Sequence, residues 1–331
     1  MKIITVYSNF KNQGGAQNMA LLLAQSLNKD VPVVLTCTPL EEIDCCYKSM
    51  GFIFEPFNMM TVWKYRSALF LSHSRNTTTF LCFINSLLFH SIRIIHVAHN
   101  IFLNLKLFSL FPLNIIAVSN GVKKNLIDYF EIPADRIKVI FNGLEDKYDS
   151  SMQKDHVGSI VKVLFAGRVC KVKRQLEFVL KMKNKLDERI QIYFAGVGED
   201  MEQLEKAVEN NSQFHILGQI DIMKELYFFD YMLLFSEKEG LPVTLIEGCM
   251  FAKPLITNNI LSVLDLNENG YNGFVYKNWE DLLVGLNQLP SCNEEEYKKL
   301  SFNSRQMYLS KFRLSYMIEE YKRYIVNCYG K

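Results

Sequence analysis

Two glutamates, Glu239 and Glu247, flank the expected start of a helix in the segment SEKEGLPVTLIEG, residues 236–248. The segment follows an apolar, strand-like run, and Pro242 suits the first helical turn, where a missing backbone N–H costs nothing. Backbone N–H groups without an intrahelical acceptor point away from such a helix start, and with the helix dipole they form an anion site that suits a diphosphate. These groups are expected near Leu241, Val243 and Thr244.

The two carboxylates suit the two ends of one long ligand rather than a shared proton. Glu239 lies in the loop, and Glu247 lies more than one turn inside the helix, at ~1.5 Å per residue. A carboxylate has lone pairs for both hydroxyls of a vicinal pair, so Glu239 can bind sugar hydroxyls and Glu247 ribose hydroxyls. The alternative is that Glu239 is a solvated loop charge and Glu247 a residue of the helix surface.

The spacing of these glutamates matches the EX7E motif of retaining, nucleotide-sugar-dependent glycosyltransferases. The run EGLPVTLIEG resembles the version in glycosyltransferase family 4, also named glycosyl transferases group 1. The resemblance implies that Glu239 contacts the donor sugar, as a catalytic residue, and that Glu247 contacts the nucleotide ribose. It also implies donor contacts for the residues between them, namely Gly240, Leu241, Val243 and Thr244.

A second block, FAGRVCKVK at residues 165–173, resembles the family's strand followed by Gly-Arg and by a Lys five positions after the Arg. In the family these cations contact the donor phosphates, so the resemblance assigns that catalytic role to Arg168 and Lys173. Cations aimed at a departing nucleoside diphosphate stabilise its growing negative charge without a metal. The family usually has Gly after this Lys, whereas this chain has Arg174, a departure that could alter the turn. The competing interpretation is a solvated helix start.

Two further segments resemble family blocks on the nucleotide side. FAGVG at residues 194–198 resembles a glycine turn after a strand, where Gly196 would let the backbone approach the nucleotide closely. HILG at residues 215–218 matches the strand beside the base pocket, so backbone contacts to the base are expected near Leu217. His215 itself is interpreted as a structural residue.

The N-terminal half matches the family more loosely. Gly14 and Gly15 follow the first expected strand and resemble the family's glycine loop near the donor phosphates and the acceptor. VAHN at residues 97–100 resembles a strand that ends in a histidine near the reacting sugar, which makes His99 a further catalytic candidate. His96 lies an odd number of positions earlier and is predicted to face the other side of the strand. The alternative for His99 is a buried, hydrogen-bonded histidine.

Apolar runs that alternate with helical patterns predict the elements that position these residues. A strand at residues 2–7, a glycine turn, a helix at 16–27 and a strand at 31–36 are typical of the start of a doubly wound sheet. A polar stretch without periodicity, residues 146–158, is the expected linker. The alternation of strands and helices restarts after it, which predicts a second parallel sheet.

The pattern and the resemblance together predict an α/β protein of the GT-B class, with two facing Rossmann-like, doubly wound parallel-sheet domains and an interdomain cleft. Residues 1–150 are the expected acceptor-binding domain, and residues 151–311 are the expected nucleotide-sugar-binding domain. Residues 312–331 resemble the family's closing helix, which returns to the N-terminal domain. Ligands would lie outside the carboxyl ends of the strands.

Composition narrows the function classes. The net charge of +2 is too small for a dedicated nucleic-acid binder, so no nucleic-acid partner is expected. The eight cysteines show no CxxC pair and no zinc spacing, which indicates reduced thiols and a cytoplasmic location. Residues 1–7 do not resemble a signal peptide. The apolar stretch at 76–92 is interrupted by polar residues and predicts a buried helix, while the apolar segment 102–111 leaves open a peripheral contact with the inner face of a membrane.

By resemblance, the chain is a retaining, metal-independent glycosyltransferase of the hexosyltransferase class that uses no cofactor. It would move a sugar from a nucleotide diphosphate-sugar donor, by default a UDP-sugar, to a saccharide or lipid-linked saccharide acceptor in bacterial surface polysaccharide biosynthesis. Two alternatives are a nucleotide-sugar epimerase on the same scaffold and a non-catalytic, glycan-binding relative, because a fold does not determine a function. The paired acidic and basic blocks favour transfer over both.

Overall fold

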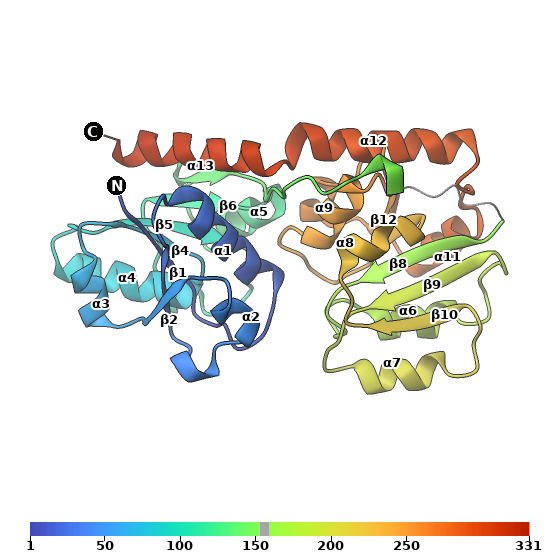
Figure 1. Cartoon of the computed structure of the whole chain (residues 1–331), viewed down its shortest axis with the longest axis horizontal. Helices are drawn as coiled ribbons and strands as arrows, with labels where there is room; N and C mark the ends of the chain where they lie inside the picture. Colours follow the sequence, from blue (N-terminus) through green and yellow to red (C-terminus); the bar gives the residue numbers. More distant parts are fainter. Residues whose placement is uncertain (153–158, 331) are drawn as a thin grey trace. The chain divides into compact units, whose positions relative to one another are not determined.

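The computed structural model describes residues 1–152 and 159–330 of the chain. These residues form two compact units (Figure 1). The first unit contains Met1–Asn142 and Ser315–Lys331, and the second contains Gly143–Leu314. Each unit is built around its own parallel β-sheet.

The first unit holds a seven-stranded sheet with the strand order β3-β2-β1-β4-β5-β6-β7. Its strands are β1 (Ile3–Val6), β2 (Val33–Thr36), β3 (Ile53–Pro56), β4 (Leu69–Ser72), β5 (Arg93–Ala98), β6 (Asn114–Ala117) and β7 (Ile137–Val139). Successive side chains of a strand point to opposite faces, and both faces are buried here. Val34 packs with Leu21 on one face, whereas Leu35 packs with Leu81 on the other. Helices must therefore cover both faces of the sheet.

The helices of this unit are α1 (Gly15–Leu27), α2 (Cys45–Lys48), α3 (Met59–Lys64), α4 (Arg75–Leu87), α5 (Asn120–Asp128) and nearly all of α13 (Leu314–Tyr329). Because Leu21 belongs to α1 and Leu81 to α4, these two helices cover opposite faces. The end of α13 is tied to the sheet by Tyr329, whose hydroxyl donates to the carbonyl of Ile94 at 3.0 Å and accepts from the amide side chain of Asn114 at 3.0 Å. The chain thus returns to the first unit at its end.

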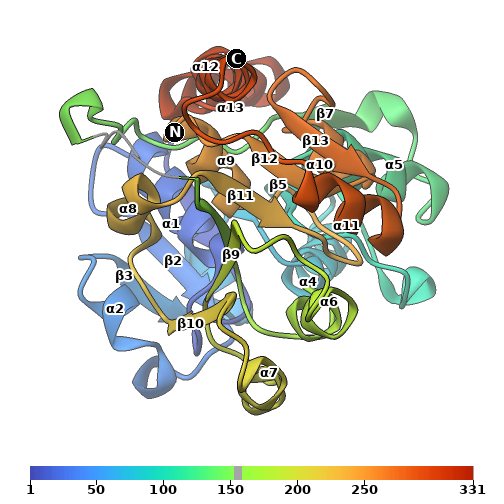
Figure 2. The ribbon, with the colours of Figure 1, turned by 90° about the vertical axis from the view of Figure 1, so that its right-hand side faces the viewer.

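The second unit holds a six-stranded parallel sheet with the order β10-β9-β8-β11-β12-β13. Its strands are β8 (Val161–Ala166), β9 (Ile190–Ala195), β10 (Phe214–Gly218), β11 (Tyr231–Leu234), β12 (Leu255–Asn258) and β13 (Gly273–Tyr276). Its helices are α6 (Gln175–Met182), α7 (Met201–Val208), α8 (Ile222–Glu225), α9 (Val243–Met250), α10 (Leu261–Leu264), α11 (Trp279–Asn287) and α12 (Glu295–Lys311). Figure 2 shows α6, α7 and α11 on one face of the sheet and α8, α9 and α12 on the other.

Each sheet contains one point where the strand order reverses direction. In the first sheet the chain moves outward from β1 to β3 and then returns to β4, on the other side of β1. In the second it moves outward from β8 to β10 and then returns to β11, on the other side of β8. The loops that leave such a pair of strands diverge and open a crevice at the carboxyl ends, where ligands of doubly wound sheets bind. Ligand binding is therefore expected at the loops after β1 and β4 and at the loops after β8 and β11.

The predicted pair of doubly wound parallel sheets is confirmed. The structure adds three strands that the sequence pattern did not reveal, namely β3, β4 and β13. The segment 221–229 forms only the short helix α8, which is followed by a 3-10 turn at Leu226–Phe228. Residues 153–158 of the predicted linker lie outside the described residues. None of the helices in the described ranges is long and apolar enough to cross a membrane, and the apolar stretch at 76–92 forms most of α4.

Candidate active site

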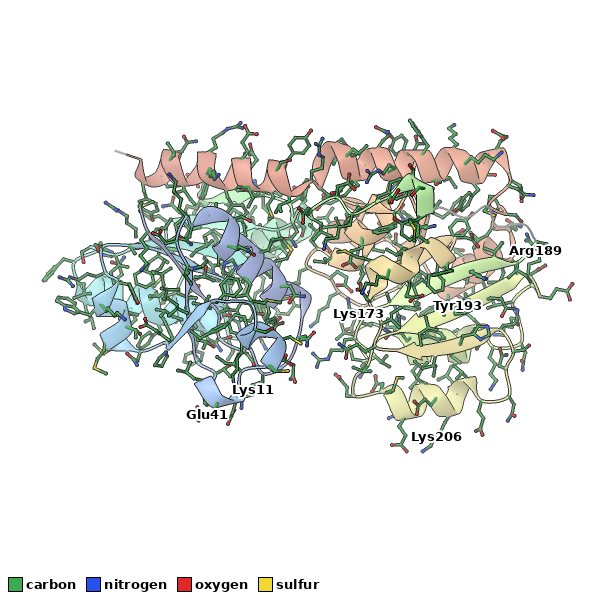
Figure 3. All side chains as sticks on the ribbon, viewed as in Figure 1. Lys11, Glu41, Lys173, Arg189, Tyr193 and Lys206 are labelled. Carbon is green, nitrogen blue, oxygen red and sulfur yellow. The ribbon has the colours of Figure 1, made fainter. Side chains whose placement is uncertain are left out.

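The loops after β8 and β11 meet at the reversal point of the second sheet. The backbone N–H of Glu237 donates to the carbonyl of Val172 at 2.8 Å, which joins the two loops through their main chains. The ammonium of Lys173 donates to Oε1 of Glu239 at 2.6 Å, which joins them again through side chains. The side chains of Lys173 and Glu239 are only 21% and 9% exposed. Figure 3 shows Lys173 where the strands of this sheet end and Arg189 at the opposite end.

The backbone of Glu239 is also fixed from the side. The hydroxyl of Ser262, which is fully buried, donates to the carbonyl of Glu239 at 2.8 Å. An ion pair in this setting is less screened by water than a surface pair. The structure thus brings together two of the residues that the sequence singled out, Lys173 and Glu239, although 66 positions separate them in the chain.

Helix α9 begins directly after this loop and presents unpaired amides. Among the described residues, the N–H groups of Val243 and Thr244 have no hydrogen-bond acceptor, and the first amide with an intrahelical acceptor is that of Leu245, 3.1 Å from the carbonyl of Pro242. Pro242 is the N-cap residue, one position before the place that the sequence pattern suggested. The open amides and the positive end of the helix dipole form a site for an anion. Leu241 and Gly240 lie buried beside it.

Glu247 projects from the second turn of α9. Its carboxyl group is half-buried and makes no ion pair or hydrogen bond within the part of the chain that the structure describes. Burial, and to a lesser extent the negative charge of Asp221, raise the pKa of Glu247 to about 7. A carboxyl group that is shielded from water and has no partner is suited to accept hydrogen bonds from ligand hydroxyls.

Glycines allow the loops after β8 and β9 to pack tightly against each other. Gly167 and Gly196 have φ angles of +150° and +133°, which other residues rarely adopt. A Cβ atom on Gly196 would lie 2.0 Å from the carbonyl oxygen of Gly167. The N–H of Gly196 donates to the carbonyl of Gly218 at 2.7 Å, so the same turn is also anchored to the end of β10. No side chain fits at Gly196 without moving the loop that carries the cations.

The two arginines of the β8–α6 loop differ in their surroundings. Arg168 is 70% exposed, and its Nε donates to Glu199 at 3.1 Å. Arg174 has a left-handed backbone with φ of +62°, a conformation that favours glycine. Its guanidinium donates two hydrogen bonds to Glu177, at 2.7 and 2.9 Å, and lies 4.5 Å from the ring centre of Trp279. Arg174 therefore adopts a backbone conformation that favours glycine, and its side chain gains partners.

The strand β10 contains an irregularity at the residue predicted to lie near a base. Ile216 pairs with Phe194 and Gly218 pairs with Ala195, which leaves Leu217 as an additional residue without a register partner. The backbone of such a bulged residue is released from the sheet ladder. His215 hydrogen bonds to Gln191 at 2.7 Å and stacks on Tyr193 with ring centres 4.5 Å apart. These contacts give His215 a structural role in the strand.

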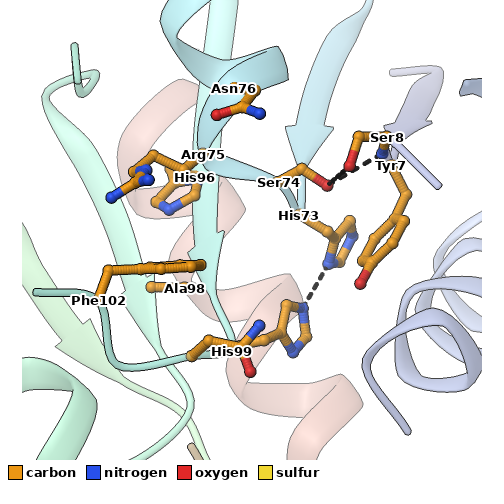
Figure 4. A pocket seen from close by; sticks show the side chains of 11 residues that line it. Tyr7, Ser8, His73, Ser74, Arg75, Asn76, His96, Ala98, His99 and Phe102 are labelled. Carbon is orange, nitrogen blue, oxygen red and sulfur yellow. Dashed lines mark hydrogen bonds between the residues drawn. The ribbon is translucent and has the colours of Figure 1, made fainter. Parts of the chain in front are cut away.

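The reversal point of the first sheet holds a pocket of about 190 Å³, shown in Figure 4. The pocket lies where β1, β4 and β5 end, so its walls are the first residues of three loops. These lining residues are Tyr7, Ser8, His73, Ser74, Arg75, Asn76, His96, Ala98, His99, Asn100 and Phe102. Within the described chain, Gly14 and Gly15 do not line it. Gly14 is instead the N-cap residue of α1, and its N–H donates to the hydroxyl of Tyr47 at 3.1 Å.

Three buried histidines define this pocket. Nδ1 of His73 lies 2.8 Å from Nε2 of His99, and the two rings are stacked (Figure 4). Nδ1 of His96 lies 2.7 Å from the hydroxyl of Thr78. Burial lowers the pKa of His99 to about 4 and of His96 to about 3, and it lowers the pKa of His73 as well. The three rings are therefore uncharged at neutral pH.

The placement of His96 differs from the expectation that it faces away from His99. Both residues line the same pocket. The strand β5 ends at Ala98, so the alternation of side chains no longer applies at His99. His73 was not among the residues predicted from the sequence. Its only signal was the short apolar run ALFLS before it, which forms β4 and ends at the same sheet edge.

The predicted residues thus fall into two groups. Arg168, Lys173, Gly196, Leu217 and Glu239 belong to loops and strand ends at the carboxyl edge of the second sheet, and Glu247 belongs to α9, the helix that begins at this edge. His99, Gly14 and Gly15 belong to the first unit. The second group supplies neutral imidazoles, and the first supplies cations, open amides and carboxylates. The cations, open amides and carboxylates at the second sheet can hold a diphosphate and the hydroxyl groups of the sugars attached to its two ends.

Comparison with known proteins identifies a protein family whose sequence pattern matches part of this chain. Residues 151–307 match the family Glycosyl transferases group 1. The chain is 26% identical over 225 residues to an uncharacterized glycosyltransferase of Methanocaldococcus jannaschii, a match that covers 63% of this chain and 57% of that protein. It is 31% identical over 120 residues to the O-antigen biosynthesis glycosyltransferase WbnH of Escherichia coli, covering 36% of this chain and 34% of that protein. The chain therefore matches less than two thirds of the length of either relative.

Solved structures resemble the whole chain. The crystal structure of Anabaena HepE in complex with UDP superposes with a TM-score of 0.83 at 16% identity and covers 99% of this chain and 100% of that chain. The complex of the same protein with UDP-glucose gives a TM-score of 0.81 with the same identity and coverage. At this level of identity the similarity concerns the fold, and it confirms the predicted GT-B class.

Proposed function

We propose that this chain, which belongs to the glycosyl transferases group 1 family, is a hexosyltransferase that moves a sugar from a UDP-sugar to a saccharide acceptor. The reaction would retain the anomeric configuration and use no metal or other cofactor. The observation that carries the proposal is the partly buried ion pair of Lys173 and Glu239, which lies beside the open amides of α9. A cation, free N–H groups and two shielded carboxyl groups together match the chemistry of a nucleotide diphosphate-sugar.

The donor would be held along the carboxyl edge of the second sheet. The diphosphate would contact Lys173, Arg168 and the amides of Val243 and Thr244, which lack acceptors in the described structure. The sugar hydroxyls would donate to Glu239 at one end. The ribose hydroxyls would donate to Glu247 at the other, since a carboxylate accepts from two neighbouring hydroxyls.

The nucleotide base would lie against the ends of β9 and β10. The bulge frees the backbone at Leu217, and Gly196 has no Cβ that would obstruct a ligand. The two glycines at the start of α1 would act through their backbone and not through side chains. Gly14 and Gly15 would approach the donor phosphates or the acceptor with their backbone, from the loop after β1.

Catalysis would consist mainly of charge stabilisation. As the glycosidic bond breaks, negative charge grows on the departing UDP, and cations already in place stabilise it without reorganisation. The contact with Glu239 holds the ammonium of Lys173 in position before the donor arrives. In the first unit, His99 would contact the reacting sugar as an uncharged group, because burial keeps its pKa near 4.

The acceptor is proposed to be a lipid-linked saccharide presented at the cytoplasmic face of a membrane. The segment after β5 exposes large apolar side chains: Leu103 is 68%, Leu107 91% and Phe108 77% exposed. Exposed apolar side chains that cluster in one segment mark a surface that contacts lipid or protein. The names of two relatives, which refer to O-antigen and to capsular polysaccharide biosynthesis, support an acceptor of surface-polysaccharide chemistry.

The membrane contact can be tested with vesicles. Leu107→Glu together with Phe108→Glu is expected to abolish cosedimentation with anionic lipid vesicles, whereas Phe302→Glu, a change at a 63% exposed residue of α12, should leave it intact. Equal binding of both variants, or no binding of the unmodified protein, would reject the membrane contact. Neither of these results would affect the assignment of the donor site.

The proposed activity is tested in two steps. A thermal-shift screen with nucleoside diphosphates and their sugar conjugates should single out one base, because a ligand that binds only the folded state raises its stability. The selected UDP-sugar is then incubated with and without saccharide acceptors. UDP release with formation of a glycoside supports transfer. Conversion of the sugar to an epimer without acceptor would favour the epimerase alternative, and binding without either product would favour a non-catalytic relative.

A further inference from the structure

The hydrogen bond between His73 and His99 can hold only one proton. Nδ1 of His73 and Nε2 of His99 lie 2.8 Å apart, so one nitrogen donates and the other accepts. Both rings are buried, and burial disfavours the charged form of each. The pair therefore chooses between two neutral arrangements. In each, the tautomer of His73 dictates the tautomer of His99.

The second nitrogen of His73 distinguishes the two arrangements. Nε2 of His73 is buried and has no hydrogen-bond partner among the described residues. If His99 donated, His73 would carry its proton on Nε2, and a buried N–H would be left without an acceptor, which is rare and costly. If His73 donates from Nδ1, its Nε2 carries only a lone pair. The second arrangement is favoured, and it leaves His99 with its proton on Nδ1.

We propose that His73 is a positioning residue that keeps His99 in the Nδ1-protonated tautomer, so that His99 offers an N–H donor to an oxygen atom of a ligand in the pocket. With Nε2 engaged by His73, Nδ1 is the ring nitrogen of His99 that remains for a ligand. An N–H donor binds a hydroxyl or ring oxygen and cannot remove a proton from it. That this oxygen belongs to a sugar rests on the proposed function; the tautomer does not.

The tautomer can be measured without any substrate. In the protein labelled with ¹⁵N at histidine, two-bond NMR correlations should show His73 and His99 both protonated on Nδ1, and both neutral between pH 7.5 and 5.5. A spectrum with the proton of His99 on Nε2, or a charged imidazole at pH 7, overturns the proposal. Either result is independent of whether the protein transfers sugars, so it separates this inference from the proposed activity.

Variants at His73 test the consequence for the reaction. Asn presents an amide N–H close to the place of Nδ1, whereas Leu fills the space without a donor. His73→Leu is expected to lower kcat about tenfold, the effect of one lost hydrogen bond, with little change in the donor KM. It should also let the tautomer of His99 vary in the NMR spectrum. His73→Asn should restore both readouts, and His90→Asn, at an exposed histidine with left-handed backbone, should change neither.

A purely structural role for His73 gives a different pattern. In that case Leu and Asn would change kcat according to the stability they remove, measured by thermal unfolding, and not according to the donor they supply. Equal activity of the two variants at equal stability overturns the proposal, as does a His99 tautomer that stays fixed in His73→Leu. If the His73→Leu protein does not fold, the Asn variant and the spectrum of the unmodified protein still decide the question.

Discussion

The ammonium of Lys173 lies 2.6 Å from Oε1 of Glu239, and this contact joins the loops that follow β8 and β11. Both side chains are largely shielded from water. In the proposed complex, Lys173 contacts the donor phosphates and Glu239 the donor sugar, so the ion pair spans the bond that breaks. The pair orders both groups before the donor binds, which reduces the reorganisation needed during the reaction.

Replacing Lys173 tests the charge that stabilises the leaving group. Lys173→Ala is expected to lower kcat by about 10²–10³, because one preorganised charge stabiliser has an effect of that size. The neighbouring Lys171 is exposed and provides a matched control, and Lys171→Ala should retain nearly full turnover. Rates from UDP-release assays at saturating donor give the comparison. Turnover of Lys173→Ala within twofold of Lys171→Ala would contradict the proposed role.

The unpaired Glu247 makes donor affinity depend on pH. Its pKa of about 7 means that the free protein loses this proton as the pH rises through neutrality. If the ribose hydroxyls donate to the carboxylate, affinity for UDP-glucose should increase about tenfold between pH 6 and pH 8, following the ionised fraction. Isothermal titration of the Glu247→Gln variant should show weaker and pH-independent binding, and Glu237→Gln, at an exposed loop residue, should behave like the unmodified protein. A flat profile in the unmodified protein would remove Glu247 from the ribose site.

The close contact between the two glycine turns predicts a large effect of one methyl group. Gly196→Ala places a Cβ 2.0 Å from the carbonyl of Gly167 and is expected to destabilise the second unit by several kcal/mol or to displace the loop. Gly218→Ala is the control, because its φ is also positive, at +65°, but nothing lies within 4 Å of the added atom. It should cost about 1–2 kcal/mol. Urea unfolding of both variants measures the difference in their free energies of unfolding. Equal losses of stability would show that the close contact at Gly196 does not add to the cost of the substitution.

At Arg174, the strain of the left-handed backbone and the stabilising contacts of the side chain should nearly cancel. Arg174→Gly relieves the left-handed strain, worth about 1–2 kcal/mol, but loses a partly exposed ion pair and a cation–π contact, each about 0.5–1 kcal/mol. The net change in unfolding free energy should be within about 1 kcal/mol of zero. Arg174→Ala keeps the strain and loses the contacts, so it should be less stable than Arg174→Gly. The reverse order in chemical denaturation would mean that the left-handed backbone carries no strain at this position.

The buried histidines predict sensitivity to acid. In the unfolded chain a histidine binds its proton near pH 6.5, whereas folded His99 binds it only near pH 4. Between these values the unfolded state binds more protons, so the free energy of unfolding should fall as the pH is lowered from about 6.5 toward 4. Replacement by Asn, which does not titrate there, should make this decline shallower. Unfolding curves at several pH values give the slope, and an unchanged slope in His99→Asn would show that another group causes it.

The sequence predicted most readily what is local in the chain. Glu239 and Glu247 lie in one loop and helix, so their spacing and the helix start were visible together. The contact of Lys173 with Glu239 was not, because it depends on how β8 and β11 pair. His73 follows a strand of four residues that periodicity cannot distinguish from a buried loop.

Two details depended on backbone conformation that residue types do not determine. The sequence placed Pro242 in the first helical turn, but the helix begins one residue later. The sequence left open whether Arg174 alters the turn, and the arginine adopts a left-handed backbone conformation, which favours glycine. Its partner Trp279 comes from a distant helix, so the reason for this tolerance was visible only in the structure.

The most direct test of the donor site is a titration of UDP into three proteins: unmodified, Lys173→Ala and Lys171→Ala. We expect saturable binding to the unmodified protein and to Lys171→Ala, and a loss of affinity of at least tenfold in Lys173→Ala. Binding of UDP that is equally strong in all three proteins, or absent from the unmodified protein, would contradict the proposal that the carboxyl edge of the second sheet holds a nucleotide diphosphate-sugar.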